Sequence, residues 1–198
     1  FDVTRGDVPV NSVDVSYEAA KGIGYIKVSK FARNTYNEFI TAIAKLKQAG
    51  CTSFVIDLRG NTGGYMDAAI NMINEFMPEG RLIVYTEGKS FPRSDVYANG
   101  TGTCKDAPIV VLTDEISASA SEIFSGAIQD NDRGTIIGRR TYGKGLVQTQ
   151  MSLSDGSEMR LTIARYYTPS GRCIQKKYEM GNTDAYDPVS YTHLTLPT

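Results

Sequence analysis

The strongest chemical signal in the sequence is the serine-rich segment 117–122, Ser-Ala-Ser-Ala-Ser-Glu. Alanines separate its three hydroxyl side chains, so another peptide chain could approach these hydroxyls closely. The segment lies at the predicted start of a helix, where the helix dipole would stabilise a developing negative charge. One of these serines could act as a nucleophile in acyl transfer, whereas the commonest role of a serine at such a position is to cap the helix.

Two glycine-containing segments could supply the other groups that a serine nucleophile needs. In segment 57–64, Asp-Leu-Arg-Gly-Asn-Thr-Gly-Gly, paired glycines precede a predicted helix, so backbone N–H groups could bind an anion; the alternative is a simple tight turn. In segment 138–145, Gly-Arg-Arg-Thr-Tyr-Gly-Lys-Gly, glycines flank Lys144 and could let its side chain point inward. Removal from water lowers the pKa of a lysine, so Lys144 is the best candidate for a base; the alternative is an ordinary solvated lysine.

Other mechanisms fit the sequence poorly. The single histidine, His193, lies near the C-terminal end, and the sequence has no G-x-S-x-G, H-E-x-x-H or S-x-x-K motif. Segment 138–145 resembles a phosphate-binding P-loop, but Gly145 replaces the magnesium-binding hydroxyl, and a strand-like segment follows where a P-loop needs a helix. Nucleotide binding is therefore disfavoured.

Hydrophobic patterns predict the elements that would position these segments. Strands are expected at 24–31, 53–58, 81–86, 108–113 and 135–138, and helices at 35–49, 66–77 and 117–130. Thr35 and Glu38 are expected to form a capping box at the start of the first helix. The alternation of strands and helices predicts an α/β fold with parallel strands, in which ligands bind at the carboxyl ends of the strands. The three segments described above, 57–64, 117–122 and 138–145, all lie at the carboxyl end of a predicted strand.

Two further regions differ in character. Residues 87–106 are polar and glycine-rich without periodicity, so we expect a long loop without regular structure. Residues 146–153 and 158–167 alternate between apolar and polar side chains around the turn Ser-Asp-Gly-Ser, which predicts a β-hairpin.

The composition narrows the class of protein. The chain has 198 residues, 41% of them hydrophobic, and its 22 acidic and 21 basic side chains give a formal net charge of −1. That is the size and composition of one ordinary globular domain, without an apolar run of the roughly 18 residues that cross a bilayer and without a basic excess for nucleic acid. Cys51, Cys104 and Cys173 are too far apart in sequence for CxxC chemistry.

Both ends of the sequence suggest a fragment of something longer. Residues 1–10, which begin with Phe1, are expected to form a strand, a turn and another strand, interior to a longer protein. Residues 189–198, Val-Ser-Tyr-Thr-His-Leu-Thr-Leu-Pro-Thr, resemble the translation of a transposase mosaic-end sequencing adapter. We therefore expect the natural protein to be interrupted near Pro188 and His193 to be foreign; the alternative is a genuine disordered tail.

Taken together, segments 57–64, 117–130 and 134–148 resemble the C-terminal processing peptidases, also called tail-specific proteases, a family of serine-lysine endopeptidases. The similarity covers roughly residues 10 to 178 in the same order and spacing. It implies that Ser119 is the nucleophile, that Lys144 is the base and that Gln148 orients this lysine.

The resemblance further implies an oxyanion hole made from the backbone N–H of Ala120 and that of either Gly63 or Gly64, a choice that the sequence leaves open. Four neighbouring residues are interpreted as capping and framing residues of the site: Ser117, Ser121, Glu122 and Asp130. No metal or organic cofactor is implied.

The family resemblance also implies a domain organisation. Residues 1–12 would be the end of a truncated PDZ domain and its linker, residues 13–188 a crotonase-like, layered α/β peptidase core with an additional C-terminal β-hairpin, and residues 189–198 the non-native tail. Expected substrates are the C-terminal tails of proteins or peptides, and no nucleic acid. A periplasmic or envelope location, membrane association only through a missing N-terminal segment, and a homo-oligomer are all compatible with the family.

Two other functions remain as alternatives. One is a catalytically silent relative that binds peptides or scaffolds an assembly. The other is a crotonase-type acyl-CoA enzyme, because that fold is related and also uses paired N–H groups as an oxyanion hole. Intact serine, lysine and glutamine at the positions named above favour the peptidase.

Overall fold

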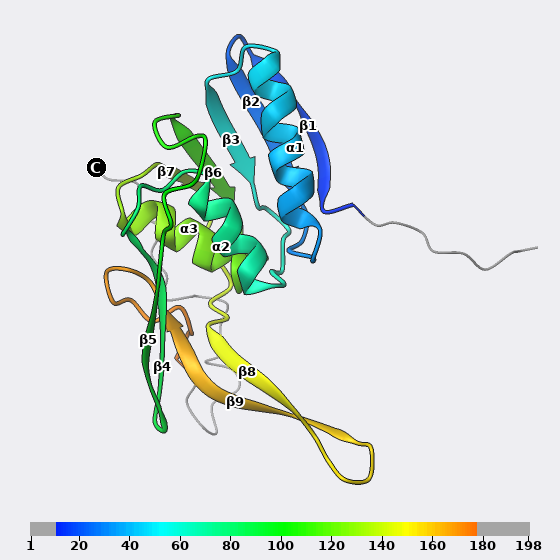
Figure 1. Ribbon diagram of the computed structural model, residues 1–198, viewed down its shortest axis with the longest axis vertical. Coiled ribbons are helices and arrows are strands. Elements are labelled where there is room, and N and C mark those ends of the chain that lie inside the picture. The colour runs from blue at the N-terminus through cyan, green and yellow to red at the C-terminus, as the bar shows by residue number, and fades with distance from the viewer. Residues whose placement is uncertain (1–10, 178–198) are drawn as a thin grey trace, which may run out of the picture.

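The computed structural model describes residues 11–177 (Figure 1). The elements follow one another in this order: β1 (Val13–Ala20), β2 (Ile23–Val28), α1 (Thr35–Gln48), β3 (Ser53–Asp57), α2 (Met66–Asn74), β4 (Leu82–Gly88), β5 (Phe91–Tyr97), β6 (Ile109–Thr113), α3 (Ala120–Asp130), β7 (Thr135–Gly138), β8 (Leu146–Ser152) and β9 (Glu158–Tyr167).

The strands form two sheets. The first has the order β1-β2-β3-β6-β7, in which β2, β3, β6 and β7 are parallel and β1 is antiparallel to β2. Parallel neighbours need crossover connections, and α1, α2 and α3 lie in those connections. The second sheet is antiparallel, with the order β5-β4-β9-β8. Its β8–β9 hairpin extends as a long ribbon away from the helices (Figure 1).

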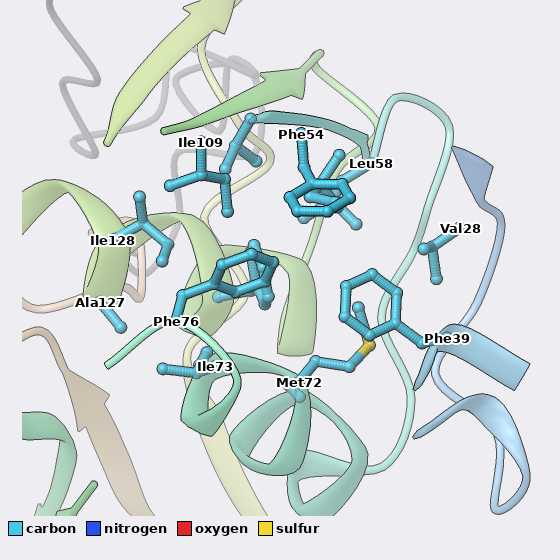
Figure 2. Close-up of a cluster of buried hydrophobic side chains, with 14 of the residues drawn as sticks. Val28, Phe39, Phe54, Leu58, Met72, Ile73, Phe76, Ile109, Ala127 and Ile128 are labelled. Atoms are coloured by element: carbon cyan, nitrogen blue, oxygen red, sulfur yellow. The ribbon is translucent and has the colours of Figure 1, made fainter. Parts of the chain in front are cut away.

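A core of aromatic and branched side chains holds the helices against the first sheet. Phe76 lies at its centre and makes edge-to-face contacts with Phe39, Phe54 and Phe124, at centroid separations of 6.1, 6.5 and 6.4 Å. Figure 2 shows Phe39, Phe54 and Phe76 among buried aliphatic side chains. These four rings come from α1, β3, α3 and the segment that follows α2, so they join β3 to two helices and to the chain just after the third.

The expected architecture is confirmed in its main features. The fold is α/β with parallel crossovers and a C-terminal β-hairpin, and the helix expected at 35–49 ends one residue earlier, at Gln48. The second helix ends at Asn74, three residues before its predicted end. The third begins at Ala120 instead of residue 117, because residues 117–119 form the bend that leads into it.

Two strands were not expected. Residues 87–106 do not form a loop without regular structure, because β5 within them pairs antiparallel with β4. Most of β5 is exposed, so its side chains lack the apolar alternation that reveals a half-buried strand. The same holds for β1, an edge strand with largely exposed side chains. Both strands are held by backbone pairing, which leaves little trace in the sequence.

The capping box at the start of α1 was a wrong prediction. The N-cap residue is Asn34, and Glu38 accepts hydrogen bonds from the backbone N–H groups of Ser12 and Val13, at 2.7 and 3.0 Å. Thr35 Oγ1 accepts from Ala32 N at 2.7 Å. Glu38 thus holds the chain where it enters β1 and does not cap the start of α1.

The predicted domain boundaries lie close to the first described residue or beyond the last one. The expected boundary between residues 12 and 13 stays a prediction, because the described residues begin at residue 11. Residues 1–10 and the tail 189–198, with His193, lie outside the described residues. Within residues 11–177, no helix is long and apolar enough to cross a membrane.

Candidate active site

Ser119 has an unusual backbone conformation between β6 and α3. It is the N-cap residue of α3, with φ 56° and ψ −112°. Positive φ is uncommon for a residue with a side chain and typically costs about 1–3 kcal/mol, so the surrounding structure must hold it in place. Such strained positions concentrate at functional sites, and here the strained residue is the predicted nucleophile.

Segment 57–64, with its paired glycines, supports the bend at Ser119 from one side. Asn61 O accepts hydrogen bonds from Ala118 N at 3.0 Å and from Ser121 Oγ at 2.9 Å. Gly63, with φ 98°, packs so closely that a Cβ atom on it would lie 2.7 Å from Ala118 O and 2.8 Å from Ser119 Cβ. Only glycine fits this position, which explains one of the paired glycines.

Glu122 connects the serine-rich segment 117–122 to segment 138–145, the basic loop that contains Lys144. Its carboxylate is fully buried and accepts four hydrogen bonds. Oε2 accepts from the backbone N–H groups of Ser119 at 2.9 Å and Lys144 at 2.8 Å, while Oε1 accepts from Thr141 Oγ1 and Gly143 N, both at 2.7 Å. Burial raises the pKa of Glu122, and the four donors oppose this shift. One carboxylate therefore sets the spacing between the backbones of the two predicted catalytic residues.

Further bonds fix the basic loop on its other side. Tyr142 N donates to Ser117 O at 2.9 Å, and Gly145 N donates to Gln175 Oε1 at 3.0 Å. Lys144 itself has an exposed side chain. The loop backbone is thus held firmly, while the amine of Lys144 lies at the surface.

The three predicted catalytic side chains line one pocket of about 430 Å³, although they come from different elements. Besides Ser119, Lys144 and Gln148, it is lined by Gly64, Tyr65, Leu146, Gln150, Arg160 and Tyr166. Among the described residues, the structure contains no hydrogen bond between the side chains of Ser119, Lys144 and Gln148. The amide of Gln148 instead donates to Thr162 Oγ1 at 3.4 Å.

The oxyanion candidates differ in whether their N–H groups are free. Gly63 N already donates to the side chain of Asn61 at 2.8 Å, in a buried bond. Within residues 11–177, neither Gly64 N nor Ala120 N has an acceptor. Gly64 also lines the pocket with Ser119, whereas Gly63 does not.

A second, largely apolar pocket of about 570 Å³ adjoins the first and shares Lys144 and Leu146 with it. Ile116 and Tyr142 also line this pocket and are half exposed. Such a pocket suits an apolar side chain of a bound peptide, next to the pocket that contains Ser119.

Sequence reasoning missed several residues of the first pocket. Arg160 and Tyr166, both on β9, and Tyr65, just before α2, belong to no motif. The hairpin prediction could have indicated Arg160, because the register pairs it with Gln150, two residues beyond Gln148 on β8. That register depends on the turn and on a bulge between Val147 and Gln148, which the sequence does not specify.

An ionic cluster anchors the beginning of the glycine segment. Asp57 is buried at the end of β3, forms a bidentate pair with Arg59 and accepts from Tyr25 Oη at 2.6 Å. Burial alone would raise the pKa of Asp57, but the hydrogen bonds from Arg59 and Tyr25 outweigh it and lower this pKa to about 2. Burial, followed by the hydrogen bond to Asp57, raises the pKa of Tyr25 to about 12, and Arg59 opposes this shift.

This cluster predicts a loss of stability in acid. The pKa of Asp57 is about 2 in the folded chain, against about 3.9 when unfolded. Ionised Asp57 thus contributes about 2–3 kcal/mol at neutral pH, and this contribution is lost as the pH falls from about 5 to 1. Urea unfolding at several pH values should show a steeper loss of stability in the wild type than in Asp57→Asn, in which Asp114 and Asp130, whose pKa values are also lowered, still contribute. Asp106→Asn, which alters an exposed carboxylate, should keep the slope; a slope unchanged in Asp57→Asn would contradict the assignment.

The comparisons with known proteins agree with this geometry. The model of peptidase family S41 matches residues 22–183. The chain is 36% identical to a carboxyl-terminal-processing protease of Synechocystis sp. over 201 residues, covering 100% of this chain and 47% of the relative. It is 38% identical to the chloroplastic C-terminal processing peptidase of Tetradesmus obliquus, covering 80% of this chain and 34% of that protein. The chain therefore spans less than half the length of these relatives.

Solved structures give the same result. The photosystem II D1 C-terminal processing protease superposes with a TM-score of 0.77 at 35% identity, covering 87% of this chain and 47% of that one. A putative S41 protease from Bacteroides fragilis has a TM-score of 0.70 at 17% identity, over 95% of this chain and 56% of that one, which shows a shared fold. With the family match extending over β2 to β9 and both pockets, the chain belongs to peptidase family S41.

Proposed function

We propose that this chain is the catalytic part of a serine endopeptidase that cleaves proteins near their C-termini, with Ser119 as the nucleophile and Lys144 as the base. The observation that carries this proposal is the strained Ser119 at the start of α3, in one pocket with Lys144. The names of the relatives, which describe C-terminal processing, support the choice of substrate.

The reaction would be acyl transfer. A peptide in the pocket would displace water from Lys144, which favours the neutral amine that can accept a proton. Lys144 Nζ takes the hydroxyl proton of Ser119 while Oγ attacks the carbonyl carbon. The proton then passes to the leaving amine, and water hydrolyses the acyl-enzyme by the same route in reverse.

Two further roles follow from the arrangement of the pocket. Ala120 N and Gly64 N would hold the oxyanion, because neither N–H group has an acceptor in the described part of the chain, whereas Gly63 N is bound to Asn61. Gln148 donates its amide N–H to Thr162, so its carbonyl oxygen would be the atom that accepts from Lys144 and orients it. No cofactor is needed for these steps.

The organisation of the whole protein is also part of the proposal. Residues 1–12 would close a PDZ domain that binds substrate tails by strand addition, and residues 13–188 would be the peptidase core. Residues 189–198 would be foreign sequence. We propose a periplasmic or envelope location, as the family resemblance implies, with any membrane attachment through a segment before residue 1.

A fluorophosphonate probe tests the nucleophile directly. We expect the chain to react covalently and stoichiometrically with the probe, and mass spectrometry of the digest to find the modification on Ser119. The reaction should depend on a pocket geometry that denaturation destroys, so urea-unfolded chain is the control. An unmodified chain would favour the catalytically silent relative, and saturable binding of a CoA thioester without labelling would favour the acyl-CoA enzyme.

A further inference from the structure

The β8–β9 ribbon has two chemically different faces. In an antiparallel pair, residues directly opposite each other point to the same side of the sheet. One face is polar and carries the pairs Gln148–Thr162, Gln150–Arg160 and Ser152–Glu158. The other face carries Met151 opposite Met159. The polar face begins at the catalytic pocket, because Gln148, Gln150 and Arg160 all line it.

Arg160 contributes a positive charge to this pocket. Its side chain is exposed, and within residues 11–177 it makes no hydrogen bond or ion pair. The acid next to it on the same face, Glu158, accepts a hydrogen bond from Gln150 instead. Among residues 11–177, no aspartate or glutamate lines the pocket, and the charged residues that line it are Lys144 and Arg160. The pocket therefore favours an anionic ligand.

The register of the ribbon gives the length of β8 between the start of the strand and the position of Arg160. Gln150, which is paired with Arg160, lies four residues along β8 from Leu146. At about 3.3 Å per residue, this corresponds to roughly 13 Å. An extended substrate that runs along β8 from Leu146, which lines the pocket together with Ser119, would reach Arg160 after about four residues.

We propose that Arg160 binds the free C-terminal carboxylate of the substrate, so that the polar face of the ribbon holds the last residues of the tail and determines how many are removed. This inference rests on the proposed function. A guanidinium binds a carboxylate through two parallel N–H bonds, which gives both affinity and orientation. The peptidase core would thus recognise a chain end itself.

A binding measurement tests the proposal without turnover. The chain with Ser119→Ala would be titrated into a fluorescein-labelled ten-residue peptide of alternating alanine and serine, with either a free carboxylate or an amide at its C-terminus. We expect the acid to bind about tenfold more tightly than the amide, the usual size of one charge-assisted contact at a partly exposed site. Adding Arg160→Gln should remove this ratio.

Arg165→Gln is the matched control. Arg165 is also an exposed arginine on β9, but it lines a different pocket, with Glu87 and Lys89. This variant should keep the acid-to-amide ratio of the parent. Equal binding of acid and amide, no measurable binding of either, or an unchanged ratio in Arg160→Gln would overturn the proposal.

Cleavage products provide a readout that separates this proposal from the proposed function. With Ser119 intact, mass spectrometry of the digested acid peptide should show released tails of about four residues, and Arg160→Gln should broaden the distribution of lengths. Products with the same broad distribution in wild type and Arg160→Gln would overturn the role of Arg160 while leaving the peptidase activity established. An inactive chain that still binds the acid in preference to the amide would instead overturn the proposed function.

Discussion

A Ser119→Gly variant is expected to be more stable than Ser119→Ala by about 1 kcal/mol, although both variants should be inactive. The reason is the backbone of Ser119, whose φ of 56° is strained for any residue that carries a Cβ atom. Glycine adopts this conformation without the strain of about 1–3 kcal/mol, and the larger entropy of its unfolded chain offsets about 0.5–1 kcal/mol of that gain. Glycine is also accepted at an N-cap.

Loss of the hydroxyl should remove turnover in both variants. Removal of the nucleophile or of the base leaves only binding and oxyanion stabilisation, so we expect kcat/KM to fall by a factor of at least about a thousand in Ser119→Ala and Lys144→Ala. Initial rates of cleavage of a fluorogenic peptide measure this effect. Lys21→Ala, which alters an exposed lysine in the turn between β1 and β2, should retain wild-type activity.

Different results would identify different errors. If Ser119→Gly were less stable than Ser119→Ala, the bend would not be strained, and position 119 would be an ordinary helix cap. Activity near the wild-type level in Ser119→Ala or Lys144→Ala would show that the chemistry lies elsewhere. A stabilised but inactive Ser119→Gly would demonstrate that the fold gives up stability to aim this hydroxyl, which is typical of a catalytic position.

The parts of the fold that were predictable are those in which one face of an element is buried. Helix α1 and strand β3 carry continuous apolar patterns because they contact the core, and their limits were found almost to the residue. The hairpin was predictable from its turn chemistry. Strands β1 and β5 were not, because their side chains are mostly exposed and only backbone hydrogen bonds place them.

The site shows the same division. Motifs placed Ser119, Lys144 and Gln148 on three segments, and topology brought them to one pocket. The sequence could not indicate that Gly63 N is bound by the side chain of Asn61, since this depends on the path of a loop. Nor could it show that Glu122 does more than cap a helix. Its contacts with Gly143 and Lys144 span 21 and 22 residues, and only the tertiary structure creates them.

The second large effect is expected for Glu122→Gln. The two sides of an amide differ, because one is an acceptor and the other a donor. All four partners of Glu122 donate to it, so an amide nitrogen must face either Ser119 N and Lys144 N or Thr141 Oγ1 and Gly143 N. At least one buried backbone N–H then lacks an acceptor. We expect the free energy of unfolding to fall by about 3 kcal/mol, the cost of one or two buried unsatisfied groups.

Activity should fall further than this loss of stability explains. At a temperature where Glu122→Gln remains fully folded, the rate of fluorophosphonate labelling of Ser119 should be at least about tenfold below that of the wild type, because a small displacement of a reacting group can lower rates severely. Peptide binding should change much less, since Glu122 lies beneath the pocket and does not line it.

Ile43→Ala is the control that separates positioning from stability. Ile43 is buried in α1 within the core, away from both pockets, and its truncation should cost about 2–5 kcal/mol. If Glu122 acts only as part of the framework, both variants should label at the wild-type rate while folded. If its carboxylate sets the distance between Ser119 and Lys144, only Glu122→Gln should be slow, because a single oxygen atom, Oε2, accepts from the backbone N–H groups of both residues.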